Sequence, residues 1–272
     1  MTDRIIETLG EDNLLNLLGP VTGGLMAMTW LTEIKWNDGI ERKSYIKLFP
    51  ADRELGFINE ITGFLLAKAC GLPLPSHAGM VKIPQGFLKP KDNISSWAFA
   101  ISEVPGNSPT SMFNLSDKLT SKQAKPITDL LEAWKYLPNC FAFDDWTANL
   151  DRNPGNLIVS NTGDICLIDH SNLPIDIKWQ ASDLVDDMHY SGWIEKLLTL
   201  TNSHDKLNKS KVSLAASKHP TQYLNAIKEL TFWWDRYLAS DLPRRESIER
   251  FIENRANSSH FRLSSHFNIL AV

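Results

Sequence analysis

The sequence predicts an α+β fold in two lobes, a strand-rich N-terminal lobe over residues 1–107 and a helix-rich C-terminal lobe over residues 108–272. Runs of β-branched and aromatic residues between turn residues dominate the first range, whereas apolar residues at helical spacing dominate the second. The turn-rich segment "PGNSPTSMFNLSD" lies at the junction and is the best candidate for a linker. Hydrophobic residues make up 43% and charged residues 22% of the chain, a balance typical of a globular protein with a substantial core.

The N-terminal lobe is predicted to be an antiparallel sheet with one helix. Residues 5–18 predict a short helical lead, after which "TGGLMAMTWLTEIKW" and "IERKSYIKLF" predict two strands. Asp38 and Gly39 lie between these strands, and an Asp-Gly pair in that position is a strong hairpin signal. Pro50 ends the second strand, and two further strands are predicted in "AGMVKIP" and "SWAFAISEV".

The helix of this lobe is predicted in "RELGFINEITGFLLAKACG", where Gly71 is placed as a C-terminal stop. In the C-terminal lobe, "AKPITDLLEAWKYL" predicts a helix, and "GNLIVS" and "ICLID" predict a hairpin across residues 161–164. Residues 182–272 are predicted to be largely helical, with a polar break at "TNSHDKLNKSK". Within that range "DLVDDMHY" is placed on a helix.

Charge, apolar runs and cysteines narrow the class of protein. A net charge of −4 gives no strong signal for a nucleic-acid partner. The N-terminus carries charges throughout, unlike a signal peptide, and no window approaches the ~18 uncharged apolar residues of a membrane span. Cys70, Cys140 and Cys166 lie in apolar contexts without CxxC spacing and are interpreted as core thiols of a reducing compartment. We therefore expect a cytoplasmic protein without a membrane partner.

Two carboxylates and an amide surround the predicted hairpin of the C-terminal lobe, in "NLDRNPGN" and "LIDHS". Asp169 follows an apolar run, where an unpaired carboxylate is costly. Because Mg²⁺ prefers oxygen ligands and takes one or two carboxylates, Asn156 and Asp169 are candidate metal ligands. Asp151 would then orient an attacking hydroxyl. The alternative is that Asp151 and Asn156 form Asx turns or cap a short helix.

Four residues of the N-terminal lobe extend this constellation: Gly23 and Gly24 at the turn into a strand, Lys47 on the next strand and Glu60 on the helix. Phosphoryl transfer from ATP needs positioning and charge neutralisation. Glycines let backbone N–H groups approach phosphates, and a lysine held by a glutamate offers a charge to them. The pattern predicts ATP and Mg²⁺ as cofactors, although each residue alone is also consistent with a turn or a surface charge.

The D-x-x-x-x-N spacing equals that of the protein-kinase catalytic loop, but the usual preceding His-Arg and the D-F-G motif are missing. The segments "WTANLDRNPGNLIV…GDICLIDHS" and "YIKLF…INEITGFLLAKACGLPLP" resemble those of HipA-like kinases. This family is related to the HipA toxin and, more distantly, to phosphoinositide 3/4-kinases. The match runs from about Gly19 to Asp169 in order, and "LPRRESIERFIENR" is similar to the family's closing helix.

The resemblance implies a bilobal protein-kinase-like fold with ATP and Mg²⁺ in the cleft between the lobes, a Ser/Thr-type protein acceptor and, by analogy, a neutralising partner protein. It implies Asp151 as the catalytic base and "ISEVPG" as a hinge whose Glu103 and Val104 backbone pairs with adenine. The family phosphorylates a serine in its own glycine-rich loop, but here "GPVTGGLMAMT" has none. Ser171 occupies a position where the family often has glycine.

Two other functions remain alternatives. Small-molecule kinases of the aminoglycoside or choline type share the Asp, Asn and Asp spacing, but they usually carry a histidine two residues before the first aspartate, where this chain has Asn149. The other alternative is a pseudokinase module that binds nucleotide without transferring phosphate. No motif in the sequence defines the acceptor or the oligomeric state.

Overall fold

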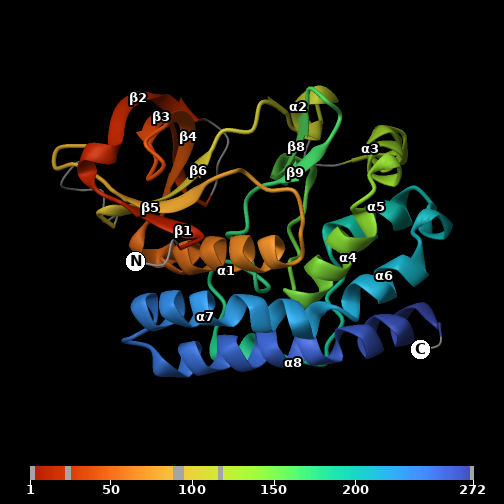
Figure 1. Ribbon diagram of the computed structural model, residues 1–272. Coiled ribbons are helices and arrows are strands. Elements are labelled where there is room, and N and C mark those ends of the chain that lie inside the picture. Colours follow the sequence, from red (N-terminus) through yellow and green to blue (C-terminus); the bar gives the residue numbers. More distant parts are fainter. Residues whose placement is uncertain (1–3, 22–25, 88–94, 116–118, 270–272) are drawn as a thin grey trace.

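The N-terminal part of the chain forms a six-stranded sheet in the computed structural model, which describes residues 4–21, 26–87, 95–115 and 119–269 (Figure 1). The strand order is β1-β5-β6-β4-β3-β2. The strands are β1 (Ile6–Leu9), β2 (Leu14–Val21), β3 (Met28–Lys35), β4 (Glu41–Leu48), β5 (Ala78–Lys82) and β6 (Trp97–Ser102). Helices make up most of the rest, so the mixed α+β class is confirmed.

The predicted hairpin at Asp38 and Gly39 is present between β3 and β4. Gly39 has φ +80°, in the left-handed region that favours glycine, and the Asp38 carboxylate accepts the backbone N–H of Ile40 at 3.0 Å. The register pairs Lys47 of β4 with Thr29 on one side and with Phe99 of β6 on the other. Lys47 therefore lies near the end of a central strand, where neighbours on both sides fix its direction.

The prediction of a helical lead over residues 5–18 is wrong. These residues form β1 and β2, joined by a 3₁₀ turn at Glu11–Asn13. The prediction of a purely antiparallel sheet is also wrong, because β1 pairs with β5 in parallel. Ile6 and Leu9 are fully buried by this pairing. Pairing with β5 and burial account for β1, whereas β2 is mostly exposed and becomes a strand by pairing with the neighbouring β3.

Helix α1 (Leu55–Ala69) packs between the six-stranded sheet and helix α7 (His219–Tyr237) (Figure 1). Residues 55–67 are all buried, which explains why the helix is apolar around most of its circumference. Gly71, with φ +66°, follows the end of the helix as predicted. Gly63 permits a close approach of another segment, because a Cβ there would lie 2.3 Å from the Cβ of His170.

The turn-rich segment at the junction is more than the predicted linker. It contains strand β7 (Gly106–Asn107) and the short helix α2 (Pro109–Met112). Strand β7 pairs with β8 (Leu157–Ser160), which forms the predicted hairpin with β9 (Ile165–Leu167). The segment therefore contributes the edge of a second, three-stranded antiparallel sheet.

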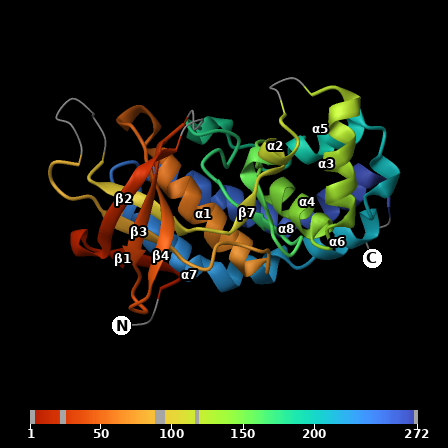
Figure 2. The same cartoon turned by 90° about the horizontal axis from the view of Figure 1, so that it is seen from above.

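The six-stranded sheet lies at one end of the molecule and α3 to α6 lie at the other, with α7 and α8 side by side along both (Figures 1 and 2). The helices not yet given are α3 (Ser121–Ala133), α4 (Leu137–Trp146), α5 (Trp193–Leu200), α6 (Lys209–Ala216) and α8 (Leu242–Phe267). The helical C-terminal region and its polar break between α5 and α6 are as predicted. The helix predicted in "DLVDDMHY" is wrong: the carbonyls of Asp186 and Met188 instead accept hydrogen bonds from Arg255 of α8.

A buried ionic cluster fastens α4 to α8. The Asp145 carboxylate accepts hydrogen bonds from Arg262 at 2.6 and 3.0 Å, and Arg255 lies 3.4 Å from the same carboxylate. Burial alone would raise the pKa of Asp145, but the hydrogen bond from His189 and the two guanidinium groups lower it well below its usual value. Asp145 is therefore a structural ion in this fold, with its charge compensated from α8.

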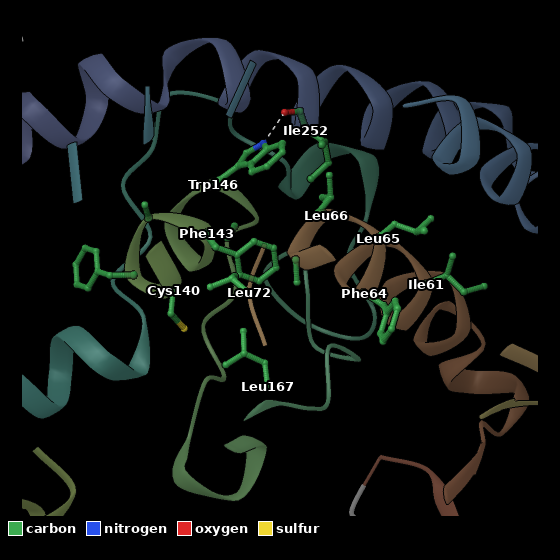
Figure 3. Packing of buried hydrophobic residues seen from close by; sticks show 14 of the residues in the cluster. Ile61, Phe64, Leu65, Leu66, Leu72, Cys140, Phe143, Trp146, Leu167 and Ile252 are labelled. Carbon is green, nitrogen blue, oxygen red and sulfur yellow. Dashed lines mark hydrogen bonds between the residues drawn. The ribbon is translucent and has the colours of Figure 1, made fainter. Parts of the chain in front are cut away.

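Large aromatic side chains fill the contacts between helices. Trp146 is fully buried and donates its indole N–H to the carbonyl of Ile252 at 2.8 Å, as Figure 3 shows. Trp233 and Trp234 are buried, and Trp234 donates to the Thr62 hydroxyl of α1 at 2.9 Å. The three cysteines are free thiols, and two of them, Cys140 and Cys166, are buried. Across the described ranges, none of the helices combines the length and apolarity that a membrane crossing requires.

Candidate functional site

A cleft of ≈ 780 Å³ brings together residues that are distant in the sequence. It lies where the ends of β4 and β6 meet the loop before β8 and the segment after β9. Gly23 and Gly24 lie outside the described residues, whereas Val21 and Met26 on either side of them line the cleft. The predicted site residues in its lining are Lys47, Glu103, Val104, Asp151, Asn156 and Asp169.

Lys47 and Glu60 make the predicted contact. The ammonium nitrogen of Lys47 lies 2.5 Å from Oε1 of Glu60, and the two residues are only 9% and 1% exposed. The other oxygen of Glu60 accepts the backbone N–H of His170 at 2.9 Å, so this carboxylate joins β4 to the segment after β9. Burial raises the pKa of Glu60 to about 7, although the charge of Lys47 opposes the rise.

Asp169 lies two residues after β9 with φ +57°, a conformation that is uncommon for a residue other than glycine. Its Oδ2 is 2.9 Å from Nζ of Lys47, and its Oδ1 accepts the N–H and the hydroxyl of Ser171. Burial would raise the pKa of Asp169, but Lys47 and Ser171 hold it well below its usual value. A single ammonium thus contacts both Glu60 and Asp169, and the lowered pKa of Asp169 keeps a negative charge at the wall of the cleft, which favours a cation there.

The Asp151 carboxylate is held between two amides. Asn153 donates to its Oδ1 and Asn172 donates to its Oδ2, both at 2.7 Å. The side-chain N–H of Asn156 donates to the main-chain carbonyl of Asp151 at 2.5 Å, which closes the loop between them. The cap of the 3₁₀ turn at Pro154–Asn156 is Asn153, so the capping alternative for Asp151 itself is wrong.

Arg152 and His170 support the loop that contains Asp151 and Asn156. Arg152 is fully buried, lies 3.3 Å from Asp144 of α4 and donates to the carbonyl of Ile168 at 3.0 Å. The Arg152 guanidinium is also 3.2 Å from Nδ1 of His170. Burial and the charge of Arg152 lower the pKa of His170 well below its usual value, so its ring is neutral and structural.

The predicted hinge lies in the cleft wall. Glu103 uses its backbone N–H to bond the carbonyl of Lys43 at 2.8 Å. Among the described residues, we find no hydrogen bond to the carbonyl of Glu103 or from the N–H of Val104. These two groups belong to one trans peptide bond and point in opposite directions, so the edge of one adenine ring can pair with only one of them.

The sequence alone missed several residues that shape the site. Asn172 has no motif that distinguishes it, and only the chain path brings it to Asp151. Gly63 looked like an ordinary glycine within a helix, but it allows His170 to approach α1. The adjacent acidic residues Asp144 and Asp145 lie outside the lining of the cleft and pair with buried arginines.

The donor set fits a hard divalent cation. Asn156 uses its amide N–H on Asp151, which leaves its amide oxygen as a neutral ligand, and the Asp169 carboxylate provides a charged one. Oxygen ligands of this kind suit Mg²⁺, which completes its octahedron with water and phosphate oxygens. No family model matches this chain, and no curated protein matches it either.

Proposed function

We propose that this chain is an ATP- and Mg²⁺-dependent phosphotransferase of the HipA-like kinase type, with a bilobal kinase-like arrangement. The observation that carries the proposal is the contact of Lys47 with both Glu60 and Asp169 in a cleft that also contains Asp151. A buried lysine held by two carboxylates, in a cleft whose lining also includes Asp151, suits the positioning of a charged phosphate chain.

Each residue has a role in this proposal. The Glu103 carbonyl or the Val104 N–H pairs with adenine, and Lys47, held by Glu60, contacts the phosphates. Asn156 and Asp169 hold Mg²⁺, which when bound neutralises charge on the phosphate oxygens. Asp151, kept in place by Asn153 and Asn172, accepts the proton of the attacking hydroxyl.

The acceptor in this proposal is a serine or threonine hydroxyl of another protein, and the site of action is the cytoplasm, since all three cysteines are free thiols. Asn149, which replaces the histidine typical of small-molecule kinases, donates to Asp144 and accepts the N–H of Asp151. Asn149 therefore supports the loop that contains Asp151.

The test uses purified protein with γ-labelled ATP and Mg²⁺ in cell lysate. We expect label in a protein band, and we expect Asp151→Asn to lower transfer by about 10²–10⁴-fold while ATP still binds. Asp164→Asn is the matched control, because Asp164 is an exposed aspartate in the turn of the same hairpin. ATP binding without any transfer would favour the pseudokinase, label in a small molecule would favour the other kinase class, and absence of ATP binding would refute all three.

A further inference from the structure

A second group of ligand-type side chains lies outside the cleft. It consists of His189 in the segment before α5, Glu195 in the first turn of α5 and His266 in the last turn of α8. Their ligand atoms all lie within 4.8 Å of one another. None of the three belongs to the lining of the cleft that contains Lys47 and Asp169.

The Glu195 carboxylate lies between the two imidazoles. Its Oε2 is 2.9 Å from Nε2 of His189, and its Oε1 is 3.0 Å from Nε2 of His266. The two rings are stacked with centroids 3.9 Å apart and planes inclined by 21°, so their Nε2 atoms face the same carboxylate. Two ring nitrogens and a carboxylate that face one another form a ligand set typical of Zn²⁺.

A second observation concerns the far side of His189. Its Nδ1 lies 3.2 Å from Oδ1 of the buried Asp145, which Arg262 holds at 2.6 Å. Histidine ligands of metals usually donate their other ring N–H to such a carboxylate, which fixes the tautomer and the ring orientation. The ring of His189 is thus oriented by the α4–α8 ionic cluster with Nε2 directed at Glu195.

A third observation is a small cavity of ≈ 10 Å³ whose lining includes Asp145, His189 and Glu195. This volume corresponds to about one water-sized probe, which suits a single ligand water or ion and no larger molecule. The three side chains are 15–29% exposed, so a fourth ligand position is open to water.

We propose that His189, Glu195 and His266 bind one divalent transition-metal ion of the Zn²⁺ class, with water as the remaining ligand. The ion joins the start of α5 to the end of α8, elements far apart in the sequence. The two sites differ in the metal that they favour. The histidine nitrogens here suit Zn²⁺, whereas the oxygen ligands of the cleft suit Mg²⁺. The proposal does not depend on the activity of the cleft.

The test uses protein without a polyhistidine tag, freed of metal by chelation and titrated with Co²⁺ in excess Mg²⁺. We expect one equivalent of Co²⁺ to produce visible d–d absorption, Zn²⁺ to abolish it by competition, and Zn²⁺ to raise the midpoint of thermal unfolding. In His266→Gln and in Glu195→Gln, we expect the affinity for Co²⁺ to fall by more than about 100-fold. Loss of a residue that only orients a metal ligand lowers metal affinity by about 10–100-fold, so a larger loss indicates a direct ligand.

Two controls keep the result specific. His260→Gln changes another histidine of α8 outside the cluster and should bind Co²⁺ as the wild type does. Asp169→Asn should also keep the Co²⁺ absorption, because its change lies in the cleft. A wild-type protein that binds no Co²⁺ or Zn²⁺, or ligand variants that bind as tightly as the wild type, would show that the cluster is an ion-free salt bridge and overturn the proposal.

Discussion

Nζ of Lys47, near the end of β4, lies 2.9 Å from Oδ2 of Asp169, two residues beyond β9. This contact links the six-stranded sheet to the smaller one, and the same ammonium is held from behind by Glu60 at 2.5 Å. The lysine is buried, so its contacts form in a region of low effective dielectric, where the loss of one charge leaves the others without compensation.

We therefore expect Lys47→Met to destabilise the fold by about 3–5 kcal/mol, because Glu60 and Asp169 lose the cation that they share. Urea unfolding at neutral pH measures the change. The double variant Lys47→Met with Glu60→Gln should be less destabilised than the sum of the single variants, since the glutamine removes the unpaired charge.

The exposed pair of Lys178 with Asp52 provides a control for this prediction. Their side chains are 55% and 60% exposed, and their nitrogen and oxygen are 2.8 Å apart. Lys178→Met should leave the unfolding midpoint almost unchanged, because water screens both charges. An equal loss in the buried and the exposed variant would contradict the role given to burial.

Asn172 is expected to position Asp151 for catalysis. Asn172→Ala removes the amide that donates to Oδ2 of Asp151 at 2.7 Å, and a hydrogen bond of this kind is worth about 1.5 kcal/mol. We expect kcat to fall about tenfold while the KM for ATP stays unchanged. Asn161→Ala, in the exposed turn of the β8–β9 hairpin, should change neither constant. A change in KM alone would assign Asn172 to nucleotide binding instead.

Local signals were sufficient for several elements of the fold. Turn residues that act over a few positions determine three of them: the Asp38-Gly39 hairpin, the end of α1 before Gly71 and the β8–β9 hairpin. The contact between Lys47 and Glu60 was also expected, since a lysine near the end of a strand and a glutamate on the next helix can meet without help from distant segments.

Long-range contacts explain what the sequence did not reveal. The first of the two strands in residues 5–18 forms because β1 pairs with β5 more than sixty residues away, as the pairing of Ile6 with Ala78 shows. The positions of Asn172 and Gly63 depend on the path of the segment after β9, which no spacing in the sequence encodes. Such residues are identified only when the segments are seen together.

Asp169 is expected to couple ATP binding to Mg²⁺. In the wild type, Mg²⁺ should strengthen ATP binding, because it compensates the charge of Asp169. Lys47 does so only in part, since it also contacts Glu60. Calorimetry with and without Mg²⁺ measures the factor by which Mg²⁺ lowers the Kd for ATP. In Asp169→Asn, we expect this factor to be at least about tenfold smaller than in the wild type, which corresponds to about 1.4 kcal/mol. Asp164→Asn should retain it. An undiminished effect of Mg²⁺ in Asp169→Asn would place the cation elsewhere.

Gly63 is expected to resist substitution although it lies within a helix. Alanine favours a helix over glycine by up to about 1 kcal/mol, but the added Cβ would meet the Cβ of His170 at 2.3 Å and a methyl of Leu173 at 2.6 Å. We expect Gly63→Ala to destabilise the protein by about 1–3 kcal/mol and to weaken ATP binding, because His170 carries the N–H that holds Glu60. A variant more stable than the wild type in urea would contradict the tight packing.

His219 is expected to make stability depend on pH. It is fully buried, stacks on Trp146 at 4.5 Å and shares a hydrogen bond with Ser259 at 2.8 Å. Burial lowers the pKa of His219 to about 3, whereas an unfolded histidine titrates near 6.5. Between these two values the unfolded state binds the extra proton, so the free energy of unfolding falls as the pH falls, by up to about 1.4 kcal/mol per pH unit.

We therefore expect the wild type to lose about 2 kcal/mol more than His219→Gln when the pH is lowered from 6.5 to 5, because glutamine does not titrate. Urea unfolding of both proteins at the two pH values measures the difference, and comparing their slopes cancels the contribution of other titrating groups. His260→Gln, on the same helix as Ser259, should keep the wild-type slope, since no hydrogen bond or ring contact of His260 is found within the described ranges. Identical slopes in the wild type and His219→Gln would mean that His219 accepts its proton in the folded state as readily as in the unfolded one, and that its environment admits water.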